Sequence, residues 1–303
     1  MKKFAYSLLF VLAGLFLVDR LGGMAMQWVN YHSNDSSAPK IKYLINDVHE
    51  DIILFGTSRC QRHYVPSIIS DSLGMSVYNG GLCGADNILA HYTILTHVVS
   101  HHTPKIVCLE LMVNDYAAMG NPFKTISWFA PYFGHNEQAD SIYRLAGTYW
   151  PYKISHLYRY NAKAIQNMAG LVINSQTQNE HGHIPLPPPT KLMRKPEAED
   201  PPTNIDPLKL EYIHRFIRLC KEKGIQVVFM VSPQYTEVQK MHYDVLKQIA
   251  RQYNTPFLDY HTNGQFHDHP EYFRDAVHLC GEGAKLYSSM FAHDLKQILQ
   301  HEQ

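Results

Sequence analysis

Short, wholly apolar runs alternate along this chain with longer amphipathic segments, and this alternation constrains the fold more than any other feature. Strands that are apolar throughout need cover on both faces, which parallel sheets receive from helices. The sequence therefore predicts an α/β fold, a three-layer sandwich with a five-stranded parallel sheet. The five predicted strands are Ile52 to Phe55, Val77 to Tyr78, Lys105 to Leu111, Ile225 to Val231 and Pro256 to Tyr260.

Helices are predicted between and after these strands. One lies near Pro66 to Leu73, and Asp86 can cap the next. Asp206 with Pro207 indicates a helix start and Gly224 a helix stop. Apolar residues recur at helical spacing in four sets: Leu89, Tyr92, Leu95 and Val99; Leu210, Ile213, Ile217 and Cys220; Val238, Met241, Val245 and Ile249; Tyr287, Phe291, Leu295 and Ile298.

The first 26 residues are typical of an export signal. Lys2 and Lys3 precede an uncharged apolar stretch from Phe4 to Val18, as in a signal peptide or a signal anchor. We favour an uncleaved anchor with the lysines in the cytoplasm, and cleavage near Met24 is the alternative. The predicted organisation is a signal anchor or signal peptide over 1–26, a polar stalk over 27–50, and one domain over 51–303 with an insertion at 116–205.

The insertion begins rich in aromatic residues and ends rich in proline. It is expected to be either a helical cap or the wall of a cleft. The chain also has five cysteines, whose spacing matches no metal motif. Cys60 and Cys83 are the candidate disulfide pair in an exported protein, and five reduced, packed cysteines are the favoured alternative.

Composition excludes several classes of function. Charged residues make up 18% of the chain and the formal net charge is zero, so no basic stripe for nucleic acid is expected. An acidic disordered protein is excluded by the same balance. No Gly-rich phosphate loop leads into a helix with a lysine, and His267 to His269 is interpreted as a surface loop. Neither a nucleotide nor a metal is expected.

Polar residues suited to acyl transfer follow the predicted strands, where parallel sheets bind ligands. Ser58 follows the first strand, and a serine hydroxyl becomes a nucleophile when a base takes its proton. His278 can be that base, and Asp275 lies three residues earlier, so one turn brings its carboxylate to the other ring nitrogen. The alternative for Ser58 is a helix cap, and Asn114 and Asp115 after the third strand have the same alternative.

With these motifs in this order, the chain resembles the SGNH, or GDSL-like, hydrolases. That family has a serine after the first strand, a glycine after the second, an asparagine after the third and Asp-x-x-His near the C-terminus. The corresponding residues are Ser58, Gly84, Asn114, Asp275 and His278, and the resemblance covers roughly residues 51–116 and 206–300. It implies a flavodoxin-like architecture, a Ser-Asp-His triad, no cofactor, and an oxyanion hole made of the Ser58 and Gly84 main-chain N–H groups and the Asn114 amide.

The first motif departs from the family pattern, because Thr57 stands where the family name has Asp and Arg59 where it has Leu. Gly-Thr-Ser-Arg resembles an envelope-associated bacterial branch, some of whose members work with membrane-bound O-acyltransferases. This implies a protein anchored in the inner membrane and facing the periplasm, or otherwise exported, that acts on an O-acyl, chiefly acetyl, group of an envelope carbohydrate. Arg59 is expected either to bind an anionic substrate group or, as we favour, to form a salt bridge.

Hydrolysis and acyl transfer share the same acyl-enzyme, so the sequence leaves the choice between them open. A second class of function is a non-catalytic scaffold that keeps the fold and binds polysaccharide or an O-acyltransferase partner. The presence together of Ser58, Asn114, Asp275 and His278 argues against that alternative. A lipase-like enzyme would call for a more apolar cleft than the tyrosine-rich insertion suggests.

Overall fold

The computed structural model describes residues 1–35, 37–85, 87–172, 180–192, 194, 204–236, 243–261 and 264–301. The chain divides into two compact units. One unit joins Met1–Tyr43 with Phe123–Ser175, and the other joins Leu44–Pro122 with Gln176–Gln303. The structure thus groups the N-terminal segment with much of the insertion, whereas the sequence treated them as separate regions.

The larger unit contains a five-stranded sheet in the order β2-β1-β3-β4-β5, with every pair of neighbours parallel. Its strands are β1 Ile52–Phe55, β2 Val77–Asn79, β3 Ile106–Glu110, β4 Gln226–Val231 and β5 Phe257–Asp259. Leu54 of β1 pairs with Asn79 on one side and with Cys108 on the other. The loops that follow β1, β2 and β3 therefore all start at the carboxyl end of the sheet, as the sequence predicted.

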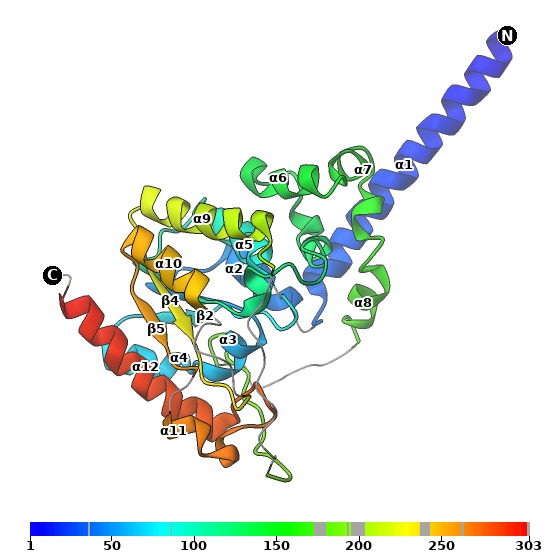
Figure 1. Ribbon diagram of the computed structural model, residues 1–303. Helices are drawn as coiled ribbons and strands as arrows, with labels where there is room; N and C mark the ends of the chain where they lie inside the picture. The colour runs from blue at the N-terminus through cyan, green and yellow to red at the C-terminus, as the bar shows by residue number, and fades with distance from the viewer. Residues whose placement is uncertain are drawn as a thin grey trace. The chain divides into compact units, whose positions relative to one another are not determined.

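Helices cover both faces of this sheet, which confirms the three-layer sandwich (Figure 1). On one face, α3 (Ser58–His63) and α4 (Pro66–Leu73) pack with α12 (Gly281–His301). On the other, α5 (Ile88–Val98) packs with α9 (Pro207–Glu222). The core on the α12 side is formed by alternate strand residues and by aromatic residues of the helix: Ile52, Leu54, Val77, Ile106, Val228, Met230, Tyr287 and Phe291.

The N-terminal caps agree with the sequence prediction for α9 and differ by one residue for α5. Asn87 caps α5 by accepting a hydrogen bond from the Leu89 N–H at 3.0 Å, and Asp86, the predicted cap, lies outside the described residues. Asp206 caps α9, as predicted. Helix α10 spans Asp244–Tyr253, while Val238 and Met241 of the predicted helix lie outside the described residues. Shorter elements are η1 Val113–Asp115, α11 Gly264–His267 and η6 Pro270–Tyr272.

The smaller unit is helical. Its longest element is α1 (Lys2–His32), which has a mean hydropathy of 1.8 in its most apolar window and is long and apolar enough to cross a membrane. Residues 27–50 are largely helical, in the end of α1 and in α2 (Ala38–Asn46). The other elements wholly in this unit are η2 Ile126–Trp128, η3 Ala130–Tyr132, α6 Glu137–Leu145, α7 Tyr149–Ile154, η4 Leu157–Tyr160 and α8 Ala164–Ala169.

Aromatic side chains of the insertion build the core of this smaller unit. The ring of Phe133 lies 5.2 Å from Tyr143 and 5.9 Å from Tyr152, measured between centroids, and all three residues are buried. Edge-to-face contacts of this kind stabilise a core beyond the area they bury. These rings therefore form the core of the smaller unit, and the choice between a cap and a cleft wall stays a prediction. Cys60 and Cys83 of the larger unit are not joined by a disulfide.

Candidate active site

Ser58 is the first residue of α3 and stands three residues beyond the end of β1. Gly56 makes this turn with φ +155°, and a Cβ there would lie 2.6 Å from the Cβ of Cys60. Only glycine therefore fits between the strand and the helix. The N-cap residue of α3 is Thr57, so the structure does not support the helix-cap alternative for Ser58. The side chain of Ser58 is left for another partner.

That partner is His278, which joins Ser58 to Asp275. The Nε2 atom of His278 lies 2.8 Å from Ser58 Oγ, and its Nδ1 atom lies 2.9 Å from both carboxylate oxygens of Asp275. A carboxylate only accepts hydrogen bonds, so Nδ1 carries the proton and Nε2 accepts the Ser58 hydroxyl. The His278 side chain is 22% exposed and that of Asp275 is 50% exposed. A substrate can therefore reach the three residues that the sequence proposed as a triad.

The charge of Asp275 is held in place by its own loop. Partial burial acts to raise the pKa of the carboxyl, but hydrogen bonds from the Val277 main chain and from His278 outweigh it and keep the pKa below its usual value. Asp275 is therefore ionised at neutral pH. An ionised partner fixes the tautomer of His278 and stabilises the imidazolium that forms when the base takes a proton.

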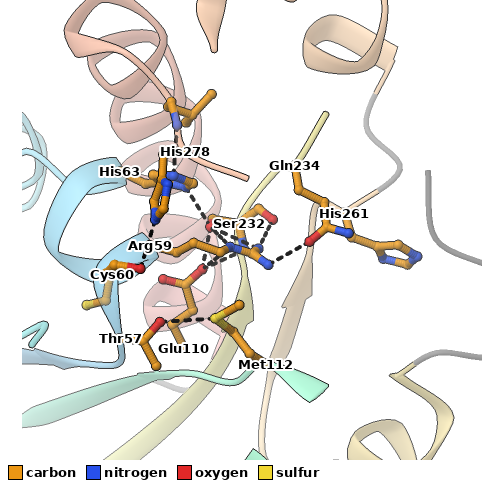
Figure 2. A network of polar contacts seen from close by, with 12 residues as sticks. Thr57, Arg59, Cys60, His63, Glu110, Met112, Ser232, Gln234, His261 and His278 are labelled. Carbon is orange, nitrogen blue, oxygen red and sulfur yellow. Dashed lines mark hydrogen bonds and ion pairs between the residues drawn. The ribbon is translucent and has the colours of Figure 1, made fainter. Parts of the chain in front are cut away.

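Arg59, the residue that follows Ser58, is surrounded by a buried polar network (Figure 2). The Nε atom of Arg59 lies 3.3 Å from Glu110 Oε1, and both side chains are fully buried. The guanidinium also donates to the Oγ and the carbonyl oxygen of Ser232, and to Gln234 Oε1 at 2.9 Å. The substrate-binding role considered for Arg59 finds no support in this geometry, because its side chain has no exposed surface. The ion pair that the sequence favoured is the one observed.

Burial and the attraction of the opposite charge compete in setting the pKa values of this ion pair. Burial raises the pKa of Glu110, although Arg59 and the hydrogen bonds from Ser232 act in the opposite direction. For Arg59, burial acts to lower the pKa, but the Glu110 carboxylate outweighs it. A buried pair of this kind is costly to break, because removing one partner leaves the other charge uncompensated.

His63 extends the network to the residue that follows the base. Its Nε2 accepts the N–H of Leu279 at 2.9 Å, so its Nδ1 carries the proton and donates to Ser232 Oγ at 2.7 Å. Ser232 in turn donates to Glu110. Burial and the nearby Arg59 charge hold the pKa of His63 well below its usual value. Ser58 precedes Arg59 and His278 precedes Leu279 in the chain. The network therefore holds the segment that carries the nucleophile and the segment that carries the base in fixed positions.

The loops that carry the predicted oxyanion donors are held by buried polar residues. Gly84 lies in the loop after β2 with φ +82°, and Asn114 lies in η1 after β3. The Nζ atom of the buried Lys209 donates to the carbonyls of Asn114, Ala117 and Met119 at 2.8 to 2.9 Å. Because β2 and β3 flank β1, both loops leave the sheet at the end that carries Ser58. Their role as donors stays a prediction.

The loop after β2 also packs tightly against α3. A Cβ on Gly81 would lie 2.3 Å from the Gln61 main-chain nitrogen, so no other residue allows this approach. Asn79 donates from Nδ2 to the carbonyls of Cys60 and Tyr64 at 2.7 and 2.8 Å. These contacts fix the helix that begins with Ser58. Gly81 therefore serves to shape this turn.

A cleft of about 1020 Å³ lies beside the start of α12, which begins three residues after His278. Its lining residues are Val65, Glu180, His181, His183, Pro185, Leu186, Pro188, Cys280, Gly281, Glu282 and Lys285. The segment over 180–188 is fixed to α3, because the Ile184 N–H donates to the Gln61 carbonyl and Arg62 donates to that of Ile184. Among the described residues, no group of three His, Cys, Asp or Glu side chains is arranged to hold a metal ion.

Comparisons with known proteins find likeness in structure alone. No family model matches the chain, and no curated protein matches it. A solved structure from Desulfitobacterium hafniense DCB-2, described as a lipolytic protein of the G-D-S-L family, is 12% identical, with 80% of this chain and 98% of that chain covered and a TM-score of 0.41. Another, described as an acylhydrolase from Bacteroides fragilis NCTC 9343, is 11% identical, with 86% and 98% covered and a TM-score of 0.39. At these TM-scores, the functional inference depends on the geometry of this chain's own residues.

Proposed function

We propose that this protein is a serine-dependent acyl-ester hydrolase or O-acyltransferase. Ser58 is the nucleophile, His278 the general base and then the general acid, and Asp275 the carboxylate that orients the base. The observation that carries the proposal is the 2.8 Å contact between Ser58 Oγ and His278 Nε2, with Asp275 bound to the other ring nitrogen. Nucleophile and base within hydrogen-bond reach, with the base oriented by a third group, are the arrangement that acyl transfer requires.

The reaction follows from the proton positions. As Ser58 Oγ attacks the ester carbonyl, its proton passes to His278 Nε2, and Asp275 stabilises the imidazolium. His278 then gives the proton to the departing alcohol, which leaves an acyl group on Ser58. A water or a carbohydrate hydroxyl, deprotonated by His278, releases that acyl group. The developing oxyanion is assigned to the N–H groups of Ser58 and Gly84 and the amide of Asn114, and loss of one such donor typically costs about 100- to 1000-fold in turnover.

The location and substrate belong to the same proposal. Helix α1 is a retained membrane anchor, since Asp19 of α1 accepts hydrogen bonds from Ser155 and from the His156 and Leu157 main chain, and cleavage near Met24 would remove these contacts. The domain faces the periplasm of a bacterium. An acetyl ester on an envelope carbohydrate as substrate, and a membrane-bound O-acyltransferase as partner, rest on the resemblance of Gly-Thr-Ser-Arg to the envelope-associated branch.

The test is hydrolysis of a chromogenic acetyl ester by the full chain in detergent, beside its Ser58→Ala variant. Ser289→Ala is the matched control, because Ser289 is an exposed serine on α12 whose hydroxyl bonds only within the helix. We expect turnover in the parent protein and in Ser289→Ala, and none above background in Ser58→Ala. Equal turnover in all three proteins would remove Ser58 from the mechanism.

If no protein turns over the small ester, labelling with a fluorescent organophosphonate separates the remaining functions. A transferase that waits for its partner still has an activated Ser58, so the parent protein labels and Ser58→Ala does not. A scaffold without activated serine labels in neither. Circular dichroism of each variant establishes that the proteins compared are folded.

A further inference from the structure

Hydrogen bonds at two neighbouring residues of α1, Asp19 and Arg20, hold this helix against the insertion. Asp19 accepts a hydrogen bond from the Ser155 hydroxyl and from the main-chain N–H groups of His156, at 2.9 Å, and Leu157, at 3.2 Å. Arg20 donates from Nη2 to the Ile154 carbonyl at 3.2 Å. The two charged residues that interrupt the apolar N-terminal stretch therefore cap and hold the segment between α7 and η4.

Two glycines of α1 allow this close contact. A Cβ on Gly23 would lie 2.5 Å from the Cβ of His156, and one on Gly22 would lie 3.2 Å from Leu157 Cδ1. Gly23 is buried although nearly all of α1 is exposed. Small residues at a helix interface let two segments approach closely. The hydrogen bonds and this close packing together fix where α7 and η4 lie along α1, relative to its apolar stretch.

Four large apolar side chains are exposed on α7 and η4, the two elements that meet at the segment bound by Asp19 and Arg20. Trp150 and Ile154 of α7 are each 68% exposed, and Leu157 and Tyr158 of η4 are 40% and 43% exposed. We call these four residues the apolar cluster. Lys153, also exposed, lies within it in the sequence. These residues lie on two elements, α7 and η4, that contact each other, and exposed apolar groups on neighbouring elements mark an interaction surface.

We propose that the apolar cluster rests in the headgroup region of the bilayer that α1 spans, an inference that depends on α1 being the proposed anchor. The uncharged stretch Phe4 to Val18 covers about 22 Å at the helical rise, whereas the hydrocarbon core measures about 30 Å. The bilayer surface therefore reaches the level of Asp19, whose carboxylate is already satisfied by hydrogen bonds. Trp and Tyr favour this boundary, where their rings meet both acyl chains and headgroups.

The test is quenching of tryptophan fluorescence by lipid-borne bromine. The full chain, in a Trp28→Phe background, is placed in nanodiscs whose phosphatidylcholine and phosphatidylglycerol carry bromine at carbons 6 and 7 of one chain, or carry none. Trp150→Phe is compared with Trp128→Phe, because Trp128 lies in the same unit and its ring is covered by Lys163 at 4.9 Å. We expect the quenched fraction to fall at least twofold in Trp150→Phe and to stay or rise in Trp128→Phe.

A further variant separates failure of the cluster from failure of the anchor. Leu9→Trp places a tryptophan in the middle of the apolar stretch, so it is strongly quenched if α1 crosses the bilayer. Quenching at position 9 with a quenched fraction unchanged by Trp150→Phe overturns the inference and leaves the apolar cluster to a protein partner. Absence of quenching at position 9 overturns the anchor, and the inference with it.

Discussion

The larger unit joins a serine, a histidine and a carboxylate by hydrogen bonds in two places, and the two sets differ in what they can do. Ser58, His278 and Asp275 are partly exposed, whereas Ser232, His63 and Glu110 are buried. In both sets, residues lie at or just after the carboxyl ends of strands in one sheet: Ser58 follows β1, Glu110 ends β3 and Ser232 follows β4. A serine, a histidine and a carboxylate joined by hydrogen bonds therefore do not by themselves make an active site.

The order of the hydrogen bonds explains the difference. In the exposed set, the carboxylate of Asp275 accepts a hydrogen bond from Nδ1 of His278. The Nε2 atom of His278 can therefore accept a proton from Ser58. In the buried set the carboxylate of Glu110 binds the serine instead. His63 there donates to Ser232, and its accepting nitrogen is occupied by the Leu279 N–H. The exposed set can move a proton, whereas both ring nitrogens of His63 are already hydrogen-bonded and the buried set holds two segments in position.

The largest expected difference between the sets comes from removing each histidine. We expect His278→Gln to lower kcat by about 10⁴-fold or more, because a serine without its base loses almost all nucleophilic catalysis. His63→Gln touches no reacting atom, so its loss of kcat should stay near tenfold and arise from a displaced His278. Ester turnover by both variants, with KM determined separately, checks this. Equal losses of kcat in the two variants would contradict the division of roles.

The carboxylates should differ in the same direction. Asp275→Asn keeps the shape of the side chain but no longer fixes the Nδ1–H tautomer of His278, so we expect kcat to fall by about 10²- to 10⁴-fold. The half-exposed position of Asp275 favours the lower part of that range, because water can replace some of its field. The unfolding midpoint should change little. A variant with unchanged kcat would show that Asp275 does not orient the base.

Removing the buried carboxylate should instead lower stability. Glu110→Gln leaves the Arg59 guanidinium charged and uncompensated in a site without solvent, so we expect the free energy of unfolding to fall by about 3–5 kcal/mol. Glu211→Gln is the matched control, since Glu211 binds Arg215 at the surface, where such a pair contributes less than about 1 kcal/mol. Chemical denaturation measures both. A Glu110→Gln loss no greater than that of the control would mean that the buried pair is not ionised.

Much of this fold could be predicted because its strands are apolar on both faces. The runs at Ile52–Phe55 and Gln226–Val231 match the predicted strands to within a residue. Ser58, Asp275 and His278 could be proposed together because a parallel sheet brings its strand-end loops to one edge, and Asp-x-x-His has the spacing of a single turn. For Gly84 and Asn114 the structure gives the position of the loops, and their function remains to be measured.

The buried set could not be predicted in the same way. His63 is one of 19 histidines, and its partner Ser232 is 169 residues away, so no local spacing links them. The one available signal was that Glu110 and Ser232 end or follow strands that the sequence had placed in the sheet. Lys209 was hidden for a similar reason, since its three partners are main-chain carbonyls, which leave no mark in a sequence.

The smallest expected effect is a change in how stability depends on pH. The pKa of His63 is lowered well below its usual value of about 6.5 in the folded protein. Below about pH 6.5 the unfolded chain therefore binds a proton that folded His63 does not, and stability falls as the pH falls, by at most about 1.4 kcal/mol per pH unit. His63→Gln should reduce this slope between pH 6.5 and about 5, while His293→Gln, at an exposed position of α12, should leave it unchanged. Denaturation across this range decides the point, and an unchanged slope in His63→Gln would mean that buried His63 is protonated and that its bond to Leu279 is not formed.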